Sequence, residues 1–255
     1  MKILNSQQIG TGNKNIIILH GFLGMGDNWR GFSKRFDGTK FRFNLVDQRN
    51  HGKSFWHESM SYDDMAKDLL LFCNSQKINN SIIIGHSMGG KTAMKFSLLF
   101  PEMVEKLIVV DIAPKAYFSD FNDIMDGYNH LNLDTYKSRS EIDNIYKTFV
   151  EDNFMRSFLM KNIYRDKDGK FRLRINLKVL KKKITEIGYF DHKNMVFNKP
   201  TAFIKGSKSN YILASDQDLI KKNFPKYTLH EVNNAGHWVH YDNPEIFEKI
   251  LKSLL

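Results

Sequence analysis

The amino-acid sequence predicts an α/β fold in which helices flank a mostly parallel central sheet. Short runs rich in Ile, Val and Phe alternate with segments of helical periodicity, as in strand-helix-strand units. Several of the runs are apolar at successive positions, which is typical of strands covered on both faces. The length of 255 residues suits a single domain, residues 1–255, that carries an insertion.

The strands and two of the helices can be placed from the pattern. The predicted strands are residues 15–19, 41–46, 81–85, 106–111, 201–206 and 227–232. A helix is expected after Ser61, because Asp64 follows it as in a capping box, and another should end before Pro101. The single cysteine, Cys73, falls on the apolar face of the first of these helices. A lone cysteine excludes an internal disulfide and a cysteine-based metal cluster.

The segment from about residue 115 to residue 198 interrupts the alternation. It shows no clear buried strand and is instead amphipathic and highly charged, which favours a helical insertion, called the cap below. A turn at Asp168 and Gly169 predicts a small hairpin within it. Placed over the carboxyl edge of a parallel sheet, the cap would roof the crevice where such sheets bind ligands.

Composition and charge exclude some classes of protein. The formal net charge is +10, but the lysines are spread along the chain and only Lys181–Lys183 form a tight cluster, so a nucleic-acid partner is not favoured. A positive surface would attract anionic substrates such as coenzyme A thioesters. No apolar run approaches the roughly 20 residues of a membrane span, and the first residues lack the apolar core of a secretion signal. We therefore expect a cytoplasmic protein without a membrane span.

The run "SIIIGHSMGGKTAM" contains a serine between glycines at the junction of a strand and a helix. A serine at so sharp a turn sits in strained backbone, and Gly85 and Gly89 remove side chains that would collide there. The turn exposes the hydroxyl of Ser87 and places it at a helix N-terminus, which favours developing negative charge. The pattern is that of a nucleophile elbow, and Ser87 is the predicted nucleophile.

The predicted general base is His237. It lies five residues after the last predicted strand, in a loop at the carboxyl edge of the sheet, and precedes a helix that Pro244 helps to start. His240 is the rival, although we expect it to face the following helix. His20 and His86 are expected to shape the site by packing. The spacing of His237 and His240 could suggest a metal, but no third ligand accompanies them, so no metal is predicted.

The tetrahedral intermediate would need two backbone donors. Met88 N–H follows the nucleophile, and Phe22 N–H lies in the glycine-rich loop after the first predicted strand. These two groups are the predicted oxyanion hole. The same loop lacks the glycine order and the following helix of a dinucleotide site, so the sequence implies no cofactor.

The motifs together identify a family. In this order, "HGFLGMGDNW", "LVDQRNHGKS", "IIIGHSMGGKTAM", "KLIVVDIAP" and "NAGHWVHYDNPEIF" resemble the α/β-hydrolase fold. "DQRNHGKS" and "VVDIAP" are similar to the small serine esterase and thioesterase subfamily that includes the YbfF-type esterases and the animal abhydrolase-domain proteins. The resemblance covers nearly the whole chain, weakly only in the cap. It implies hydrolysis of small-molecule esters or thioesters without a cofactor.

The acid of the triad is where the sequence departs from the common pattern. In many α/β-hydrolases the acid follows the strand that corresponds to residues 201–206, but this loop has Asn210 where an aspartate is expected. The resemblance implies that Asp111, at the end of "KLIVVD", can serve instead. Asp216, further along the loop, is the second possibility for the acid. The third possibility is that neither carboxylate serves.

The predicted activity is that of a carboxylesterase or acyl thioesterase. Ser87 attacks the acyl carbonyl, His237 moves the proton and Asp111 stabilises the imidazolium. The same scaffold also hosts cofactor-free haloperoxidases, carbon-carbon hydrolases and receptors without turnover. Asp47, Arg49 and His51 are expected to lock a turn beneath the site through hydrogen bonds. Trp29, Trp56 and Trp238 could line an acyl pocket, and the oligomeric state is left open.

Overall fold

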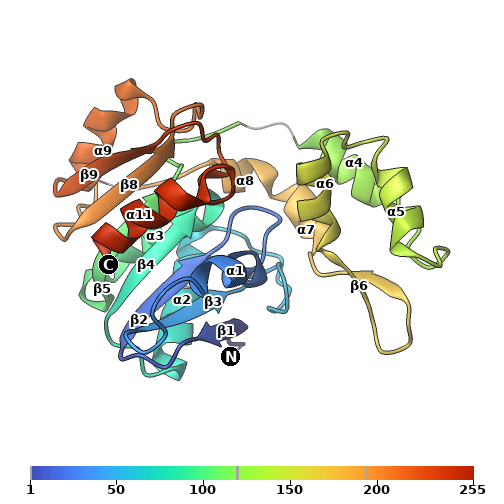
Figure 1. The fold of residues 1–255 in the computed structure, drawn as a ribbon, viewed down its shortest axis with the longest axis horizontal. Coiled ribbons are helices and arrows are strands. Elements are labelled where there is room, and N and C mark those ends of the chain that lie inside the picture. The colour runs from blue at the N-terminus through green and yellow to red at the C-terminus, as the bar shows by residue number, and fades with distance from the viewer. Residues whose placement is uncertain (1, 119–120, 193) are drawn as a thin grey trace.

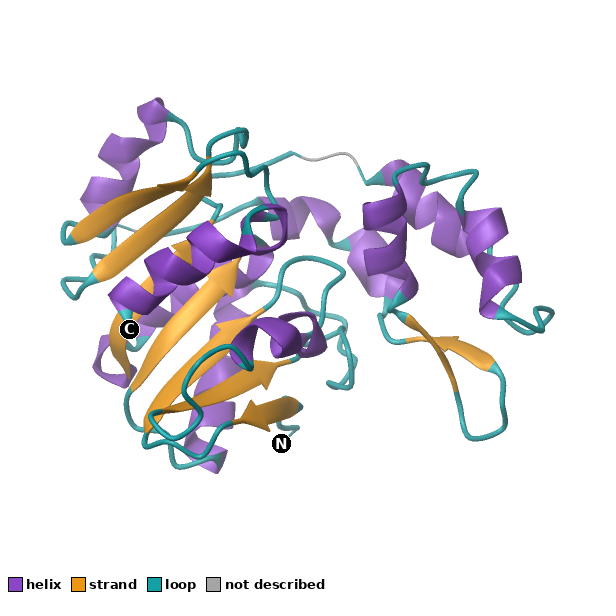
Figure 2. Cartoon of the chain, in the orientation of Figure 1, coloured by secondary structure: helices purple, strands orange, loops and turns teal. Residues whose placement is uncertain are grey.

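A seven-stranded sheet forms the centre of the molecule (Figures 1 and 2), with the strand order β1-β3-β2-β4-β5-β8-β9. The structure is a computed structural model that describes residues 2–118, 121–192 and 194–255. The strands are β1 (Ser6–Ile9), β2 (Lys14–Leu19), β3 (Phe41–Val46), β4 (Ser81–His86), β5 (Val104–Val110), β8 (Thr201–Gly206) and β9 (Tyr227–Val232). Only β1 runs antiparallel to its neighbour in this sheet; the other pairs are parallel.

The mostly parallel sheet confirms the predicted fold class, with small differences in the strands. Three strands have the predicted bounds, and β2 and β4 each gain one residue. The fourth predicted strand, residues 106–111, instead spans Val104–Val110, so Asp111 lies just after it with a positive φ of 51°. The sequence pattern missed β1, a short polar strand that pairs with the edge strand β3.

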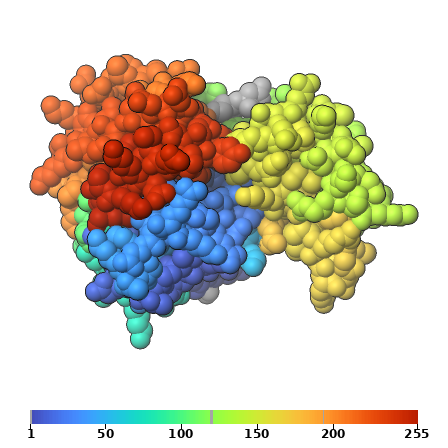
Figure 3. Space-filling model, in the orientation of Figure 1, coloured from blue at the N-terminus to red at the C-terminus, as the bar shows by residue number. Residues whose placement is uncertain are grey.

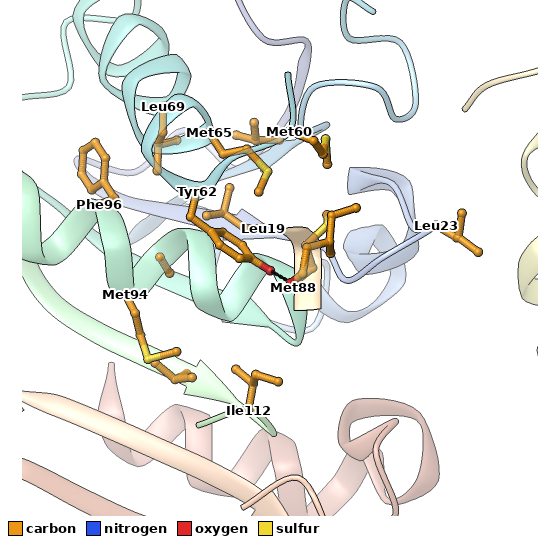
Figure 4. Packing of buried hydrophobic residues seen from close by; sticks show 14 of the residues in the cluster. Leu19, Leu23, Met60, Tyr62, Met65, Leu69, Met88, Met94, Phe96 and Ile112 are labelled. Atoms are coloured by element: carbon orange, nitrogen blue, oxygen red, sulfur yellow. Dashed lines mark hydrogen bonds between the residues drawn. The ribbon is translucent and has the colours of Figure 1, made fainter. Parts of the chain in front are cut away.

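Helices cover both faces of the sheet. They are α1 (Arg30–Ser33), α2 (Tyr62–Ser75), α3 (Met88–Leu99), α9 (Gln217–Asn223), α10 (Val239–Asp242) and α11 (Pro244–Leu254), with short 3₁₀ turns at Gly26–Trp29, Pro101–Met103 and Ala214–Asp216. Alternate residues of each strand face opposite sides, so Ile17 and Ile83 join a core with α2 and α3. Ile16 and Ile82 join a second core with α1 and α11. Figure 4 shows Met65 and Leu69 of α2 facing α3 in the first core.

The chain between β5 and β8 leaves the sheet and forms a lobe beside it (Figures 1 and 3). Its elements are α4 (Asn122–His130), α5 (Arg139–Tyr146), α6 (Asn153–Met160), β6 (Ile163–Arg165), β7 (Phe171–Leu173), α7 (Leu177–Lys182) and α8 (Ile184–Gly188). β6 and β7 form the small antiparallel hairpin that the turn at Gly169 indicated, and this glycine has a φ of +77°. The last cap helix, α8, returns the chain toward α3.

The strand order places the functional loops at one edge of the sheet. β2 and β4 are neighbours, yet the chain after β2 proceeds to β3 on the far side of β2. The loops after β2 and β4 therefore leave in opposite directions, which makes their carboxyl ends a topological switch point. Ser87 follows β4 and the glycine-rich loop follows β2, so both lie at this point.

Candidate active site

Ser87 occupies a strained turn between β4 and α3. Its φ is +54° and its ψ is −119°, a conformation that few residues other than glycine adopt. A Cβ atom on Gly85 would lie 2.2 Å from the carbonyl oxygen of Gly89, and one on Gly89 would lie 2.3 Å from that of Leu19. The glycines are therefore required by backbone contacts. The turn places Ser87 at the N-cap of α3, where the backbone N–H groups converge.

His237 and Asp111 are in direct contact. The Nδ1 atom of His237 lies 2.8 Å from Oδ2 of Asp111, although 126 residues separate them in the chain. Asp111 is completely buried, and its carboxylate also accepts from the Gly206 N–H at 3.0 Å and from the Ser209 hydroxyl. Tyr211 stacks on a face of the imidazole, with ring centroids 3.8 Å apart. The imidazole is thus fixed in orientation by a carboxylate and an aromatic face.

Asp216 lies outside this arrangement. Its carboxylate forms an ion pair with Lys115 Nζ at 2.6 Å and accepts from the Leu213 N–H at 2.8 Å. Asn210, at the position where an aspartate is common, is exposed. Of the two candidate acids, Asp111 is therefore the one that the structure places against His237.

His86 links Ser87 to His237. It precedes the serine in the chain, its Nε2 lies 2.9 Å from the backbone oxygen of His237, and the two rings are 4.8 Å apart. Burial, and after it the neighbouring His237 and His240, hold the pKa of His86 well below its ordinary value, so the ring is neutral and donates its Nε2–H to the carbonyl. His86 therefore ties the loop that carries His237 to the nucleophile turn.

His240 packs against His86, with ring centroids 5.2 Å apart, and not against the Asp111 carboxylate. It stacks on Trp29 with ring centroids 4.1 Å apart and lies 6.1 Å from the ring of Phe247 in α11, as expected of a residue that faces the following helix. Within residues 2–118, 121–192 and 194–255, no group of three or more His, Cys, Asp or Glu side chains is arranged to hold a metal ion.

Buried polar side chains hold the glycine-rich loop in place. The Leu23 N–H donates to His51 Nε2 at 3.2 Å, and the Gly26 N–H donates to Asp47 Oδ1 at 2.7 Å. His20 Nε2 accepts from the Gln48 N–H at 3.0 Å. Because burial lowers the pKa of both His20 and His51, these rings are neutral and can accept.

Arg49 holds the same turn against α2. It forms an ion pair with Asp68 of α2 at 2.6 Å, which fixes the chain after β3 to that helix. The hydrogen bonds expected of "DQRNHGKS" are therefore present, and they support the loop that carries Phe22. The Phe22 N–H has no acceptor among the residues that the structure describes, and Met88, as the first residue of α3, has no acceptor within the helix.

Comparison with known proteins assigns the family. Residues 14–244 match the model of the alpha/beta hydrolase fold. The chain belongs to the α/β-hydrolase family. Esterase YbfF of Escherichia coli is 31% identical over 95% of this chain and 93% of its own, and the mouse sn-1-specific diacylglycerol lipase ABHD11 is 33% identical over 94% and 80%. The solved structure of a marine microorganism esterase has a TM-score of 0.95 and 38% identity over the whole of both chains. The protein is thus a hydrolase of the esterase type.

Next to Ser87 this hydrolase has a largely apolar cavity of about 370 Å³. The sheet domain contributes Phe22, Met88 and Ile112 to its wall, α8 contributes Ile187, and the segment after β5 contributes Tyr117, whose N–H donates to the Gly188 oxygen at 2.8 Å. Its apolar wall and its position beside the serine make it the space available to a bound acyl group. Among the described residues, no helix is both long and apolar enough to cross a membrane.

None of the three tryptophans lines this cavity. Trp29 is buried in the core on the other face of the sheet, Trp56 is half exposed, and Trp238 packs on Phe158 of α6 with ring centroids 4.5 Å apart. The rings of the cavity wall are phenylalanines and tyrosines instead.

Sequence reasoning also missed three polar residues at the site: Ser209, Tyr211 and Lys91. Ser209 and Tyr211 lie in a loop whose path the sequence pattern does not specify. Lys91 had a signal, because it lies in the first turn of the helix that follows the predicted nucleophile, close to the start of that helix.

Proposed function

We propose that this enzyme hydrolyses small carboxylic esters and acyl thioesters, coenzyme A thioesters included, through an acyl-enzyme on Ser87. The observation that carries the proposal is the 2.8 Å contact between His237 Nδ1 and the buried Asp111 carboxylate. The strained turn of Ser87 is bonded to the same strand end, since the Ser87 N–H donates to the oxygen of Val110, the residue before Asp111, at 3.0 Å. A buried carboxylate at Nδ1 fixes the tautomer in which Nε2 is unprotonated and can accept the proton of the serine.

The reaction begins when Ser87 Oγ attacks the acyl carbonyl and His237 Nε2 takes the hydroxyl proton. The carbonyl oxygen becomes an oxyanion, which the N–H groups of Phe22 and Met88 stabilise. Asp111 stabilises the imidazolium that forms. When the tetrahedral intermediate collapses, the bond to the leaving oxygen or sulfur breaks and His237 donates its proton to that atom.

The acyl-enzyme is then hydrolysed by the same groups. Water attacks the acyl carbonyl while His237 accepts one of its protons, and collapse of the second intermediate returns the proton to Ser87 Oγ. The products are a carboxylic acid and an alcohol or thiol. The cavity beside Ser87 supports the proposal, since it offers an apolar space for the acyl chain.

Labelling and turnover measured together test this function. The wild type should react covalently with a fluorophosphonate probe and should hydrolyse a panel of p-nitrophenyl esters and acyl coenzyme A thioesters of varied chain length. Ser87→Ala should abolish both, whereas Ser253→Ala, which removes an exposed serine hydroxyl, should change neither. Labelling that persists in Ser87→Ala would overturn the assignment of the nucleophile. Ligand binding without turnover of any substrate in the wild type would favour a receptor.

A further inference from the structure

Lys91 places a buried amine on the wall of the catalytic cavity. It lies in the first turn of α3, four residues after Ser87, and its N–H donates to the Ser87 backbone oxygen at 3.1 Å. The residue is only 2% exposed to solvent and yet belongs to the cavity lining together with Ser87. The proposed reaction assigns no role to this group.

The contacts of Lys91 are to neutral groups. Its Nζ donates to the backbone oxygen of Gly188 at 2.6 Å and lies 4.8 Å from the ring centroid of Tyr117 and 5.7 Å from that of Tyr62. No carboxylate among the described residues lies within 4.0 Å of the Nζ atom. Lys95, one turn later and equally buried, differs in that Asp63 Oδ2 lies 3.3 Å from its Nζ.

A buried amine without a counter-charge is unfavourable in its charged form. Burial lowers the pKa of Lys91 to about 7, because the desolvated ammonium is not compensated by an anion. An ammonium also has three donors, of which the bond to Gly188 uses one. An anion bound in the cavity would supply both the missing charge and a further acceptor.

The position of the amine indicates which part of a substrate it would meet. In the proposed reaction His237 protonates the leaving group, so the leaving group lies on the side of His237. Lys91 lines the cavity and His237 does not. Tyr211, which stacks on His237, also lines the cavity, so the cavity runs from the side of His237 to Lys91. An acyl chain on Ser87 that points away from the leaving group would extend along α3 toward Lys91.

We propose that Lys91 binds a carboxylate at the far end of the acyl chain, so that the preferred substrates are monoesters or monothioesters of short dicarboxylic acids. The inference rests on the proposed ester hydrolysis and names its substrate class. The apolar wall of the cavity would hold the methylene groups between the two carbonyl carbons, and the Lys91 ammonium would form an ion pair at their end.

Matched pairs of ethyl esters test the proposal. Monoethyl succinate, glutarate and adipate carry a carboxylate where ethyl butyrate, pentanoate and hexanoate carry a methyl group. In the wild type, at least one monoethyl ester should exceed its apolar partner in kcat/KM by about tenfold or more. Lys91→Met should lower kcat/KM for that monoester by about 30-fold or more, as expected when one partner of a buried charge pair is removed, and change the apolar ester by less than about threefold.

Two controls separate recognition of the carboxylate from a structural role. Lys91→Arg keeps the charge and should retain most of the preference. Lys95→Met removes a buried lysine of the same helix that does not line the cavity, and it should leave the ratio of the two esters unchanged. If every apolar ester is hydrolysed as well as its monoester partner, or if Lys91→Met leaves the ratio intact, the inference is wrong.

A binding measurement in a variant without turnover distinguishes failure of the inference from failure of the proposed function. Calorimetric titration of the preferred monoethyl ester into the Ser87→Ala variant should show binding. Adding Lys91→Met to that variant should abolish the binding. Such binding in a wild type that hydrolyses no ester would contradict the proposed function and leave the carboxylate site standing. Hydrolysis of apolar esters without binding of any monoester would contradict the carboxylate site and leave the proposed ester hydrolysis unaffected.

Discussion

Asp111 and His237 meet at 2.8 Å at the carboxyl edge of the sheet, and the same carboxylate accepts from Gly206 N–H and Ser209. The acid thus follows β5, the strand beside that of the nucleophile, while two of its partners come from the chain at the end of β8. Many α/β-hydrolases have their acid in the loop after the strand that corresponds to β8. Here the Asp111 carboxylate from the end of β5 lies in that region, held by donors from Gly206 and Ser209 at the end of β8.

Replacing this carboxylate should separate the two candidate acids. Asp111→Asn keeps the shape but removes the charge that stabilises the imidazolium. We expect kcat to fall by a factor on the order of 10² or more, judged from the loss of the triad carboxylate in chymotrypsin-like proteases. Asp216→Asn, which breaks only the ion pair with Lys115, should lose much less. Steady-state kinetics should be compared at equal folded fraction, because Asp111 also satisfies a buried N–H group. A crippled Asp216→Asn beside a nearly normal Asp111→Asn would move the acid to the later loop.

The glycines of the nucleophile turn should be indispensable for stability. A methyl group on Gly85 would lie 2.2 Å from the Gly89 oxygen, and backbone on both sides prevents relaxation. We expect Gly85→Ala to lower the free energy of unfolding by more than about 3 kcal/mol. Gly31→Ala is the matched control, because a Cβ atom there meets nothing within 4 Å, and in a helix it should stabilise by about 0.5 to 1 kcal/mol. Urea unfolding measures both, and a nearly neutral Gly85→Ala would show that the turn can relax.

The bond from Leu23 N–H to His51 Nε2 should matter for catalysis, since it holds the loop that carries Phe22. His51→Phe keeps an aromatic ring but removes the acceptor and leaves the N–H group buried and unpaired. We expect kcat to fall about tenfold with little change in KM, because a displaced donor weakens binding of the oxyanion more than binding of the ground state. His51→Gln restores an acceptor near the Nε2 position and should recover most of the rate. Equal rates for the two variants would contradict a role for this bond.

The sequence predicted the parallel strands because several of them, β4 above all, carry consecutive apolar residues that both faces of the sheet bury. It missed β1 because Ser6–Ile9 has no such pattern, and its place depends on backbone pairing with β3. Ser87, His237 and Asp111 could be assigned to one edge from the sequence, because each lies at or after the end of a predicted strand and the carboxyl ends of parallel strands meet at the same edge.

The cavity wall could not be predicted in the same way. Tyr117, Ile187 and Tyr211 come from the cap and from a long loop, where no period of 2 or 3.6 residues specifies the path of the chain. The contact of Tyr62 hydroxyl with Ile187 oxygen at 2.7 Å joins residues 125 positions apart, and such contacts depend on how the cap packs on α2 and α3. Figure 4 shows Tyr62 pointing toward Met88 at the start of α3.

Acid should destabilise the fold through the buried histidines, and His51 offers the clearest test. Burial, with the nearby His20, lowers its pKa to about 3 from an ordinary value of 6.5. Between these two values the unfolded chain binds a proton that the folded protein does not. The stability that neutral His51 contributes is therefore complete above about pH 6.5 and is lost progressively as the pH falls from there to about 3.

His51→Gln should flatten this dependence, because a glutamine does not titrate. Each pH unit within the window corresponds to about 1.4 kcal/mol for one histidine, so between pH 7 and pH 5 the variant should lose about 2 kcal/mol less than the wild type. His130→Gln, at an exposed position, should lose as much as the wild type. Urea unfolding at the two pH values measures the difference. If His51→Gln loses as much stability as His130→Gln, His51 is already protonated in the folded protein at pH 5, and its Nε2 could not then accept from Leu23 N–H.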